Sequence, residues 1–292
     1  MRLLDLVRYV WAHPLNAAGR LTALGRVLRW QIGSRLAPGP VAVPFVDATR
    51  LLVARGMTGA TGNWYCGLHE HCEMAFVLHA LRETDLFLDV GANIGSYTIL
   101  ASGAAGARSI AVEPVPATFA HLRMNVALNE LEGRVRCWQG GLADKAGSLT
   151  FTSGLDTVNH VLATGEQAAG VEVPVTTLDE LLGGEAPMLI KIDVEGYERP
   201  VLAGAQRTLA DPRLLAVIME TNGSGVRYGV SDDELVSTMR EHGFGMYAYD
   251  PFARRLNVAE RGSGNTIFVR DPEAVNVRVA AARRFSLVNG SI

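Results

Sequence analysis

Short apolar runs alternate with segments of helical periodicity along most of the chain. Runs with the length and composition of buried strands lie at 86–90, 109–113, 135–139, 188–193 and 214–220. Between several of them apolar positions recur every three or four residues, as in 119–129 and 201–210, which predicts helices. This strand–helix alternation from Asp85 to Asp271 indicates an α/β architecture in which a largely parallel sheet is covered on both faces.

The C-terminal part of this region departs from the alternation. Segments 245–249 and 265–269 have strand character but are joined by a turn-rich arm, so we expect them to pair antiparallel. Before the fourth strand, the sequences SLTFTS and VEVPVT flank a glycine-rich segment, 153–170, and predict a hairpin-like excursion. There is no internal repeat, and we expect one domain with extensions at both ends.

Composition limits the kind of protein this can be. The chain has 292 residues, 48% of them hydrophobic and 20% charged, which is ordinary for a globular protein with a sizeable core. A net charge of −3 provides no basic field, so nucleic acid is not expected as a partner. There is no apolar run of about 20 residues, and we expect no transmembrane segment. Three cysteines cannot form a disulfide framework, which indicates a reducing, cytoplasmic setting.

The N-terminal segment has a charge pattern of its own. Residues 1–36 contain six arginines and one acid. Apolar residues recur at helical spacing in this segment: Leu21, Leu24, Val27, Leu28 and Ile32. One interpretation is an amphipathic helix that docks on its own domain or on a second subunit, giving a homodimer. The other is contact with an anionic membrane surface or an anionic acceptor. Pro38-Gly39-Pro40 then predicts a linker.

The motif DVGANIG, residues 89–95, follows the first predicted strand and opens a helix. Glu113 ends the next strand, 22 residues after Gly91, as in a βαβ unit that binds a nucleotide. The glycines allow a tight turn, and the acid can accept hydrogen bonds from a ribose diol. Asp89 at the strand end would repel a pyrophosphate but suits the sulfonium and ammonium groups of S-adenosylmethionine. The motif therefore favours S-adenosylmethionine over NAD.

Three segments also carry a family resemblance: LFLDVGANIGSYTILAS, AVEPVPATFAHLRMNVALN and LIKIDVEGYERPVLAGA. They resemble the FkbM-type S-adenosylmethionine-dependent methyltransferases, and KIDVEG is the most specific part. The resemblance implies a Rossmann-like class I methyltransferase fold with a seven-stranded, mostly parallel sheet and an antiparallel last strand, preceded here by a helical extension. It also implies O-methylation of a hydroxyl acceptor, often on a sugar or other glycan, or on a secondary metabolite of natural product biosynthesis.

The same resemblance implies roles for particular residues. It places Asp89, Gly91, Asn93 and Gly95 at the methionine end of the cofactor, Glu113 at the ribose, and Gly141 and Leu142 beside the adenine. Ala143 departs from the serine or glycine that is more usual in the family. The expected domain organisation is an N-terminal basic amphipathic extension at 1–40, lead-in strands and a helix capping the pocket at 41–84, the methyltransferase catalytic domain at 85–272 and a C-terminal tail at 273–292.

Acids at two strand ends are the candidates for catalysis. Ligands of open α/β sheets bind beyond the carboxyl ends of the strands, which selects Asp193 and Glu220, with Glu195 in the turn after Asp193. Methyl transfer to a hydroxyl needs alignment and a base, and Asp193 could contact the cofactor instead. His160, in the glycine-rich excursion, is a further candidate base because imidazole titrates near neutral pH. Helix capping and turn formation are the structural alternatives for the acids, and a surface-loop position for His160.

Two metal hypotheses are not favoured. Asp193, Glu220 and Asn222 would offer oxygen ligands to Mg²⁺, but carboxylates at strand ends are common in this fold, so no metal site is assigned. The stretch CGLHEHC, 66–72, lacks the second ligand pair of a structural zinc site. It predicts the start of a helix, and the resemblance implies that this lead-in packs beside the pocket. His69 and Glu70 would then line the pocket; the structural alternative is capping and charge at the helix N-terminus.

Two other functions fit the sequence less well than a methyltransferase. An NAD-type oxidoreductase is disfavoured by Asp89 and by the G-x-N-x-G spacing. A non-catalytic scaffold that only binds the cofactor is disfavoured because the acids at the strand ends are intact.

Overall fold

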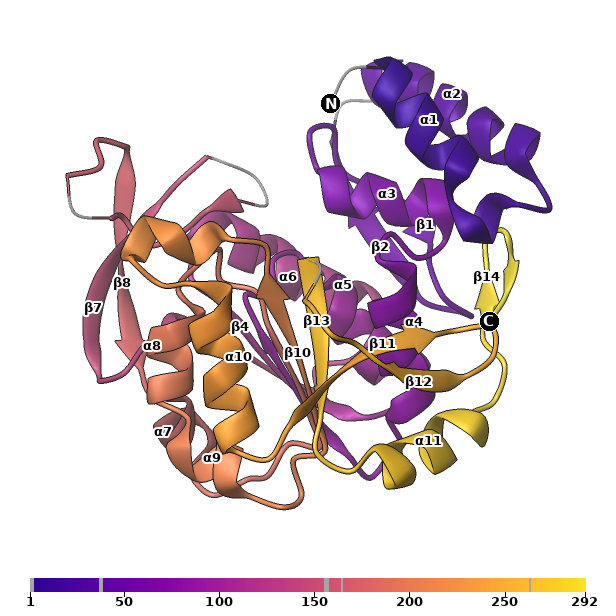
Figure 1. The fold of residues 1–292 in the computed structure, drawn as a ribbon. Helices are drawn as coiled ribbons and strands as arrows, with labels where there is room; N and C mark the ends of the chain where they lie inside the picture. The colour runs from indigo at the N-terminus through magenta and orange to yellow at the C-terminus, as the bar shows by residue number, and fades with distance from the viewer. Residues whose placement is uncertain (1–2, 37–38, 155–157, 164, 263) are drawn as a thin grey trace.

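The computed structural model describes residues 3–36, 39–154, 158–163, 165–262 and 264–292. Its central sheet contains the strands β3 (Leu86–Val90), β4 (Arg108–Glu113), β5 (Val135–Gln139), β9 (Leu189–Ile192), β10 (Ala216–Thr221), β11 (Gly245–Asp250), β12 (Arg255–Val258) and β13 (Gly264–Val269). They are arranged in the order β12-β11-β13-β10-β9-β3-β4-β5. Six strands run in one direction, whereas β12 and β13 run opposite to them. The predicted α/β sheet is confirmed (Figure 1).

The seven predicted strands are all present, and β12 is an eighth. The antiparallel pairing of β11 with β13 is confirmed. β12 lies in the arm for which only turns were expected, and it pairs with β11 at the sheet edge. Among its four residues only Leu256 is buried, so the strand has no alternating apolar pattern that sequence could reveal.

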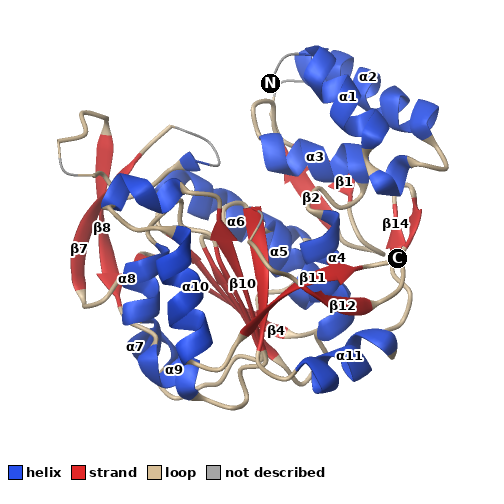
Figure 2. Cartoon of the chain, in the orientation of Figure 1, coloured by secondary structure: helices blue, strands red, loops and turns tan. Residues whose placement is uncertain are grey.

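Helices cover both faces of the sheet, which gives three layers (Figure 2). One core joins the sheet to α4 (His71–Ala80), α5 (Ser96–Ile99), α6 (Pro116–Leu128) and α11 (Pro272–Ala280). The other joins it to α7 (Leu178–Leu182), α8 (Glu198–Ala203), α9 (Gln206–Ala210) and α10 (Asp232–Glu241). Within β3, Phe87 faces the first core, while Leu86, Leu88 and Val90 face the second, as the two-residue period of a strand requires.

The predicted excursion forms a small separate sheet. Strands β7 (Gly147–Thr152) and β8 (Gly170–Thr176) pair antiparallel, and β6 (Gly141–Leu142) adds to β8 in parallel. Phe151, Val161 and Val173 belong to the local core that holds this sheet together. Residues 155–157 of the excursion, and Pro38 of the predicted linker, lie outside the described residues.

The N-terminal segment forms a layer above the first core. It contains α1 (Leu3–Ala12), a 3₁₀ turn (Pro14–Asn16), α2 (Arg20–Leu36), the antiparallel pair β1 (Val41–Pro44) and β2 (Arg50–Val53), and α3 (Thr58–Cys66). Leu6 and Val10 of α1 and Val27 and Trp30 of α2 point into that core. Of the helices that the structure describes, none is both long and apolar enough to cross a bilayer.

The segment expected to be a C-terminal tail is packed against the rest of the chain. It contains α11 and a two-stranded hairpin of β14 (Ser286–Leu287) and β15 (Gly290–Ser291). Between these strands, the Asn289 side-chain amide donates to Asn16 Oδ1 at 2.9 Å and to the Cys66 carbonyl at 2.8 Å. The C-terminal hairpin is therefore hydrogen-bonded to the N-terminal layer at two points, the 3₁₀ turn and the end of α3. It lies beneath that layer in Figure 1.

Candidate active site

A cavity of about 270 Å³ lies at the carboxyl ends of β3, β4, β9 and β10, with α3 and the turn before α4 on its other side. This is the edge at which ligands of open α/β sheets bind. Most of the residues selected from sequence line this cavity: Asp89, Gly91, Asn93, Glu113, Asp193, Glu195 and Glu220. His69 and Glu70 line the cavity as well, the position expected for them in the lead-in segment.

The glycine turn after β3 brings three strand ends together. Gly91 has a φ of +77°, and a Cβ at this position would lie 1.8 Å from the Asp193 carbonyl oxygen. Only glycine therefore allows the turn to pass so close to the end of β9. Asn93 also has a positive φ, +50°, and its backbone N–H donates to Glu113 Oε2 at 3.0 Å. Gly95 does not line the cavity. A Cβ at this residue would lie 2.5 Å from Leu122 Cδ1.

Glu113 is buried at the end of β4 and faces the cavity. Its second carboxylate oxygen, Oε1, accepts from the Val115 N–H at 2.9 Å. Burial raises the pKa of Glu113 to about 7, although these two backbone donors oppose the shift. The carboxylate is thus fixed in position by the β3–α5 turn and by the start of α6.

A buried lysine lies between two of the predicted acids. Lys191 on β9 is the direct neighbour of Asp89 on β3, and its Nζ donates to Asp193 Oδ2 at 2.7 Å. Burial alone would lower the pKa of Lys191, but the nearby carboxylates of Asp193, Glu70 and Asp89 outweigh burial and raise it. Lys191 is therefore a fixed positive charge, placed 4.7 Å from the centre of the Tyr97 ring.

Three carboxyl groups, one of them the partner of Lys191, lie close together in the cavity. Carboxylate oxygens of Asp193, Glu195 and Glu220 lie within 4.8 Å of one another. Burial, followed by the charges of Asp193 and Glu195, raises the pKa of Glu220 to about 8, and burial raises that of Glu195 to about 7. Glu195 adopts a φ of +55°, a strained conformation for a side chain of this kind, and such strain is often found at functional sites. A carboxyl with a pKa near 8 can both hold and release a proton at neutral pH.

The same three acids form the one group among the described residues whose geometry could hold a metal ion. Asn222, the other ligand considered from sequence, donates its side-chain amide to Glu220 Oε1 at 2.7 Å. The stretch CGLHEHC forms no such group within the part of the chain that the structure describes. Its Cys66 is buried beside the Asn16 amide.

Some cavity residues were missed by the sequence analysis. Besides Lys191, these include Tyr97, whose hydroxyl donates to Glu70 Oε2 at 2.7 Å, and Asn63, whose amide donates to Ser96 Oγ at 3.3 Å. Lysine in the otherwise apolar strand LIKI was the available signal, because a buried cation needs a nearby acid. Tyr97 and Asn63 gave no comparable signal.

Besides Gly95, three predicted residues do not line the cavity. His160 is buried in the excursion, where Nδ1 lies 2.9 Å from the Val158 carbonyl and Nε2 lies 2.9 Å from Glu166 Oε1. Its neighbour Asn159 lines the cavity instead. Gly141 and Leu142 are buried in the small sheet. Their catalytic and adenine-binding roles stay predictions.

The fold and the position of the site define an α/β protein of the Rossmann-like class I methyltransferase type. A family model described as the methyltransferase FkbM domain matches residues 89–246. The chain belongs to the FkbM methyltransferase family.

Two relatives illustrate the family. The 31-O-demethyl-FK506 methyltransferase FkbM of Streptomyces tacrolimicus is 34% identical over 207 residues, which cover 58% of this chain and 75% of that protein. The hexuronic acid methyltransferase AglP of Haloferax volcanii is 31% identical over 148 residues. That match covers 48% of this chain and 58% of AglP, less than two thirds of its length.

Similar solved structures concern the fold alone. The precorrin-6Y C5,15-methyltransferase of Geobacter metallireducens has a TM-score of 0.42 and 12% sequence identity. The similarity covers 75% of this chain and 92% of that structure.

Proposed function

We propose that this chain is an S-adenosylmethionine-dependent O-methyltransferase whose acceptor is a hydroxyl of a sugar or of a secondary metabolite. The observation that carries the proposal is the set of carboxylates Asp89, Glu113 and Asp193 around the cavity at the strand ends. They suit a cofactor that is cationic and has no phosphate. The names of the two relatives support oxygen as the acceptor atom and a sugar as one acceptor class.

The residues of the cavity fit this cofactor. Gly91 leaves room for close approach at the turn, where any Cβ would collide with the Asp193 carbonyl. Asp89 and Asp193 would face its positive charges, and Glu113 its ribose hydroxyls. When bound, S-adenosylmethionine supplies a methyl group on a sulfonium that an aligned nucleophile can displace.

Glu220 is the residue that we assign to the removal of the acceptor proton. It is a carboxyl with a pKa near 8, and its Oε2 is buried with no hydrogen-bond partner among the described residues. Asp193, held by Lys191, would position the acceptor or the cofactor, and Glu195 would share the proton with Glu220. On this assignment residues 85–272 are the catalytic domain, and 41–84 cap the cavity.

Methyl transfer from radiolabelled S-adenosylmethionine tests the proposal. The purified protein should bind the cofactor and label one small-molecule or glycan fraction of a cell extract. Asp89→Asn should bind it at least about tenfold more weakly, because a buried partner for its positive charge is lost. Asp233→Asn, an exposed acid on α10, is the matched control and should bind normally.

Two outcomes would contradict the proposal. Absence of cofactor binding would remove S-adenosylmethionine as the cofactor. Tight binding without label in any fraction would favour a non-catalytic scaffold.

A further inference from the structure

Exposed apolar side chains are concentrated on the two N-terminal helices. Of the fourteen large hydrophobic residues that are exposed in the described part of the chain, seven belong to residues 3–36. Three lie on α1 and four on α2: Leu3, Leu4, Trp11, Leu21, Leu28, Ile32 and Leu36. A patch of this kind on a globular protein usually marks an interaction surface.

The four residues on α2 form one stripe. Leu21, Leu28, Ile32 and Leu36 are between 53% and 79% exposed. With a helix turning about 100° per residue, their side chains fall within an arc of about 80°. This stripe points away from the face that carries Val27 and Trp30, which is packed into the core. Packing within the chain therefore does not explain the apolar character of the stripe.

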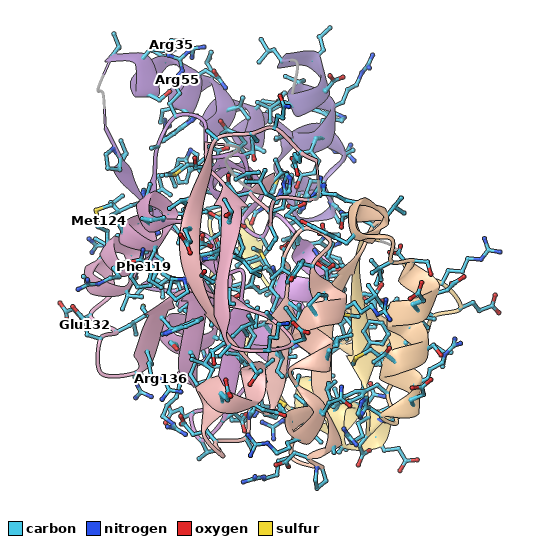
Figure 3. All side chains as sticks on the ribbon, turned by 90° about the vertical axis from the view of Figure 1, so that its left-hand side faces the viewer. Arg35, Arg55, Phe119, Met124, Glu132 and Arg136 are labelled. Carbon is cyan, nitrogen blue, oxygen red and sulfur yellow. The ribbon has the colours of Figure 1, made fainter. Side chains whose placement is uncertain are left out.

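Arginines border the stripe on both sides. The same helical geometry places Arg29 about 20° beyond one edge and Arg35 about 20° beyond the other. Arg20 lies over the Trp11 ring at 5.4 Å, which adds a cation beside the exposed face of α1. In residues 1–36, six arginines face one acid, a net charge of +5 in a chain whose total charge is −3. The layer that bears the stripe is thus the basic part of an acidic protein, and Figure 3 shows Arg35 at one extremity of the molecule.

A groove of about 490 Å³ runs along the Arg29 side of the stripe. It is lined by Thr22, Gly25, Arg26 and Arg29 of α2 and by Pro44, Trp64 and Val288. Arg26 is only 7% exposed, and its Nε–H is buried without a hydrogen-bond partner among the described residues. A buried, unsatisfied guanidinium N–H beside an exposed arginine is suited to an oxyanion such as a phosphate.

We propose that the outer face of α1 and α2 binds an anionic phospholipid membrane surface. The stripe would enter the boundary between headgroups and acyl chains, while Arg29, Arg35 and the groove hold headgroup phosphates. Charge decides between this occupant and a second copy of the chain. In a two-fold symmetric dimer that pairs the stripe with itself, the arginines of the two copies would lie close together and repel each other. An anionic membrane surface instead neutralises the charges of these arginines.

The membrane face is connected to the active-site cavity. Tyr9 of α1 places its hydroxyl 2.6 Å from Nδ1 of His69, which lines the cavity. Asn63 of α3 lines the cavity, and the next residue, Trp64, lines the groove. A membrane bound at this face would lie one helix, α3, away from the cavity. The proposal does not depend on the methyl-transfer chemistry.

Flotation with vesicles tests the proposal on the full chain. The protein should float with phosphatidylcholine vesicles that contain about 30 mol% phosphatidylglycerol and not with phosphatidylcholine alone. Binding should weaken strongly between about 0.1 M and about 0.5 M salt. Free inorganic phosphate should compete poorly, because it offers nothing to the stripe.

Three double variants, each lowering the net charge by two, separate the contributions. Leu28→Glu/Ile32→Glu should lower vesicle partitioning at least about tenfold. Arg29→Gln/Arg35→Gln should lower it about 25-fold, at roughly fivefold per arginine. Val258→Glu/Val277→Glu changes residues on β12 and α11 that are more exposed, 80% and 71% against 62% and 53%, and should leave partitioning unchanged. All three should keep the wild-type melting temperature.

Several results would overturn the proposal. These are the absence of flotation with anionic vesicles, flotation that persists in Leu28→Glu/Ile32→Glu, or an equal loss in Val258→Glu/Val277→Glu. A dimer in sedimentation equilibrium that Leu28→Glu/Ile32→Glu dissociates, without flotation of the wild type, would make the stripe an interface between two copies.

Discussion

Glu220 illustrates how a single residue can be placed for chemistry at a cost in stability. Burial and the charges of Asp193 and Glu195 raise its pKa to about 8 from an ordinary value of 4.5. A raised pKa means that the ionised carboxylate is less favourable in the folded state than in the unfolded state. The contribution of Glu220 to the free energy of unfolding is therefore most favourable below pH 4.5, where the side chain is protonated in both states. This contribution is lost as the pH rises through 8.

Glu220→Gln should therefore lose activity and gain stability. We expect kcat to fall about 100-fold or more, because the proposed base is removed. The free energy of unfolding should rise relative to the wild type by on the order of 1–3 kcal/mol at pH 8.5, and the difference should shrink toward pH 4.5. Thermal melts and rates measured from pH 5 to 9 check both expectations, with the exposed Glu132→Gln as control. A gain in stability that does not change with pH would contradict the assigned pKa.

The same acids allow a prediction about metal ions. Lys191 already supplies a positive charge 2.7 Å from Asp193 Oδ2, and Glu220 Oε1 is engaged by Asn222. We therefore expect methyl transfer to be unchanged, within about twofold, after exhaustive chelation. Activity that disappears with the chelator and returns only with added Mg²⁺ would show instead that Asp193, Glu195 and Glu220 bind the ion.

Cavity residues could be predicted from the sequence where they lie at the end of a predicted strand. Asp89, Glu113 and Asp193 were found because parallel strands present their carboxyl ends at one edge of the sheet. Lys191 was missed because interior strand positions are expected to be apolar. The contacts of His160 could not be predicted: both ring nitrogens lie within hydrogen-bond distance of groups in the excursion, and no sequence period indicates such loop contacts.

At the scale of elements, the β3–α5 turn decides whether the site exists. Gly91→Ala would place a Cβ 1.8 Å from the backbone carbonyl oxygen of Asp193, and a backbone group cannot move aside as a side chain can. Residue 91 also has a φ of +77°, which an alanine rarely adopts. We expect loss of cofactor binding and a destabilisation of about 2 kcal/mol or more. Gly59→Ala is the matched control, because Gly59 lines the same cavity and a Cβ there has nothing within 4 Å. Calorimetric titration with S-adenosylmethionine should show normal affinity for Gly59→Ala; normal affinity in Gly91→Ala would disprove the close approach.

Most elements followed from periodicity, and the exceptions have physical reasons. The helix that the stretch CGLHEHC was expected to begin is α4, and its residues from Met74 to Ala80 are all buried. α3 was not predicted, because glycines at 59 and 62 disfavour a helix and only tertiary packing stabilises this one. Gly62 accommodates His69, whose ring would lie 2.5 Å from a Cβ there. The contact that requires the glycine is 7 residues away in sequence and could not be read from a local pattern.

At the scale of the whole molecule, the C-terminal hairpin is packed against the N-terminal layer, which the sequence did not reveal. The 273–292 segment has no strong period in its last ten residues, and its hairpin is defined by contacts with residues far away in sequence. Asn16 Oδ1 accepts one hydrogen bond from the Arg26 guanidinium at 3.0 Å and another from the Asn289 amide at 2.9 Å. The membrane-binding face that we infer is thus held on the catalytic core partly by the last residues of the chain.

Asn289→Ala should loosen the N-terminal layer without changing the sheet. The substitution removes the donor to Asn16 Oδ1 and leaves the carbonyl of buried Cys66 without that hydrogen bond, which should cost about 1–3 kcal/mol. Hydrogen exchange should accelerate in α1 and α2, while the strands β3, β4 and β9 keep wild-type protection. The exposed Asn257→Ala on β12 serves as control. Faster exchange confined to the N-terminal helices would show that this layer opens as a unit of its own, so that a membrane could bind it or shift it while the cavity floor stays intact. Unchanged exchange in α1 and α2 would mean that Leu6, Val10, Val27 and Trp30 alone hold the layer in place.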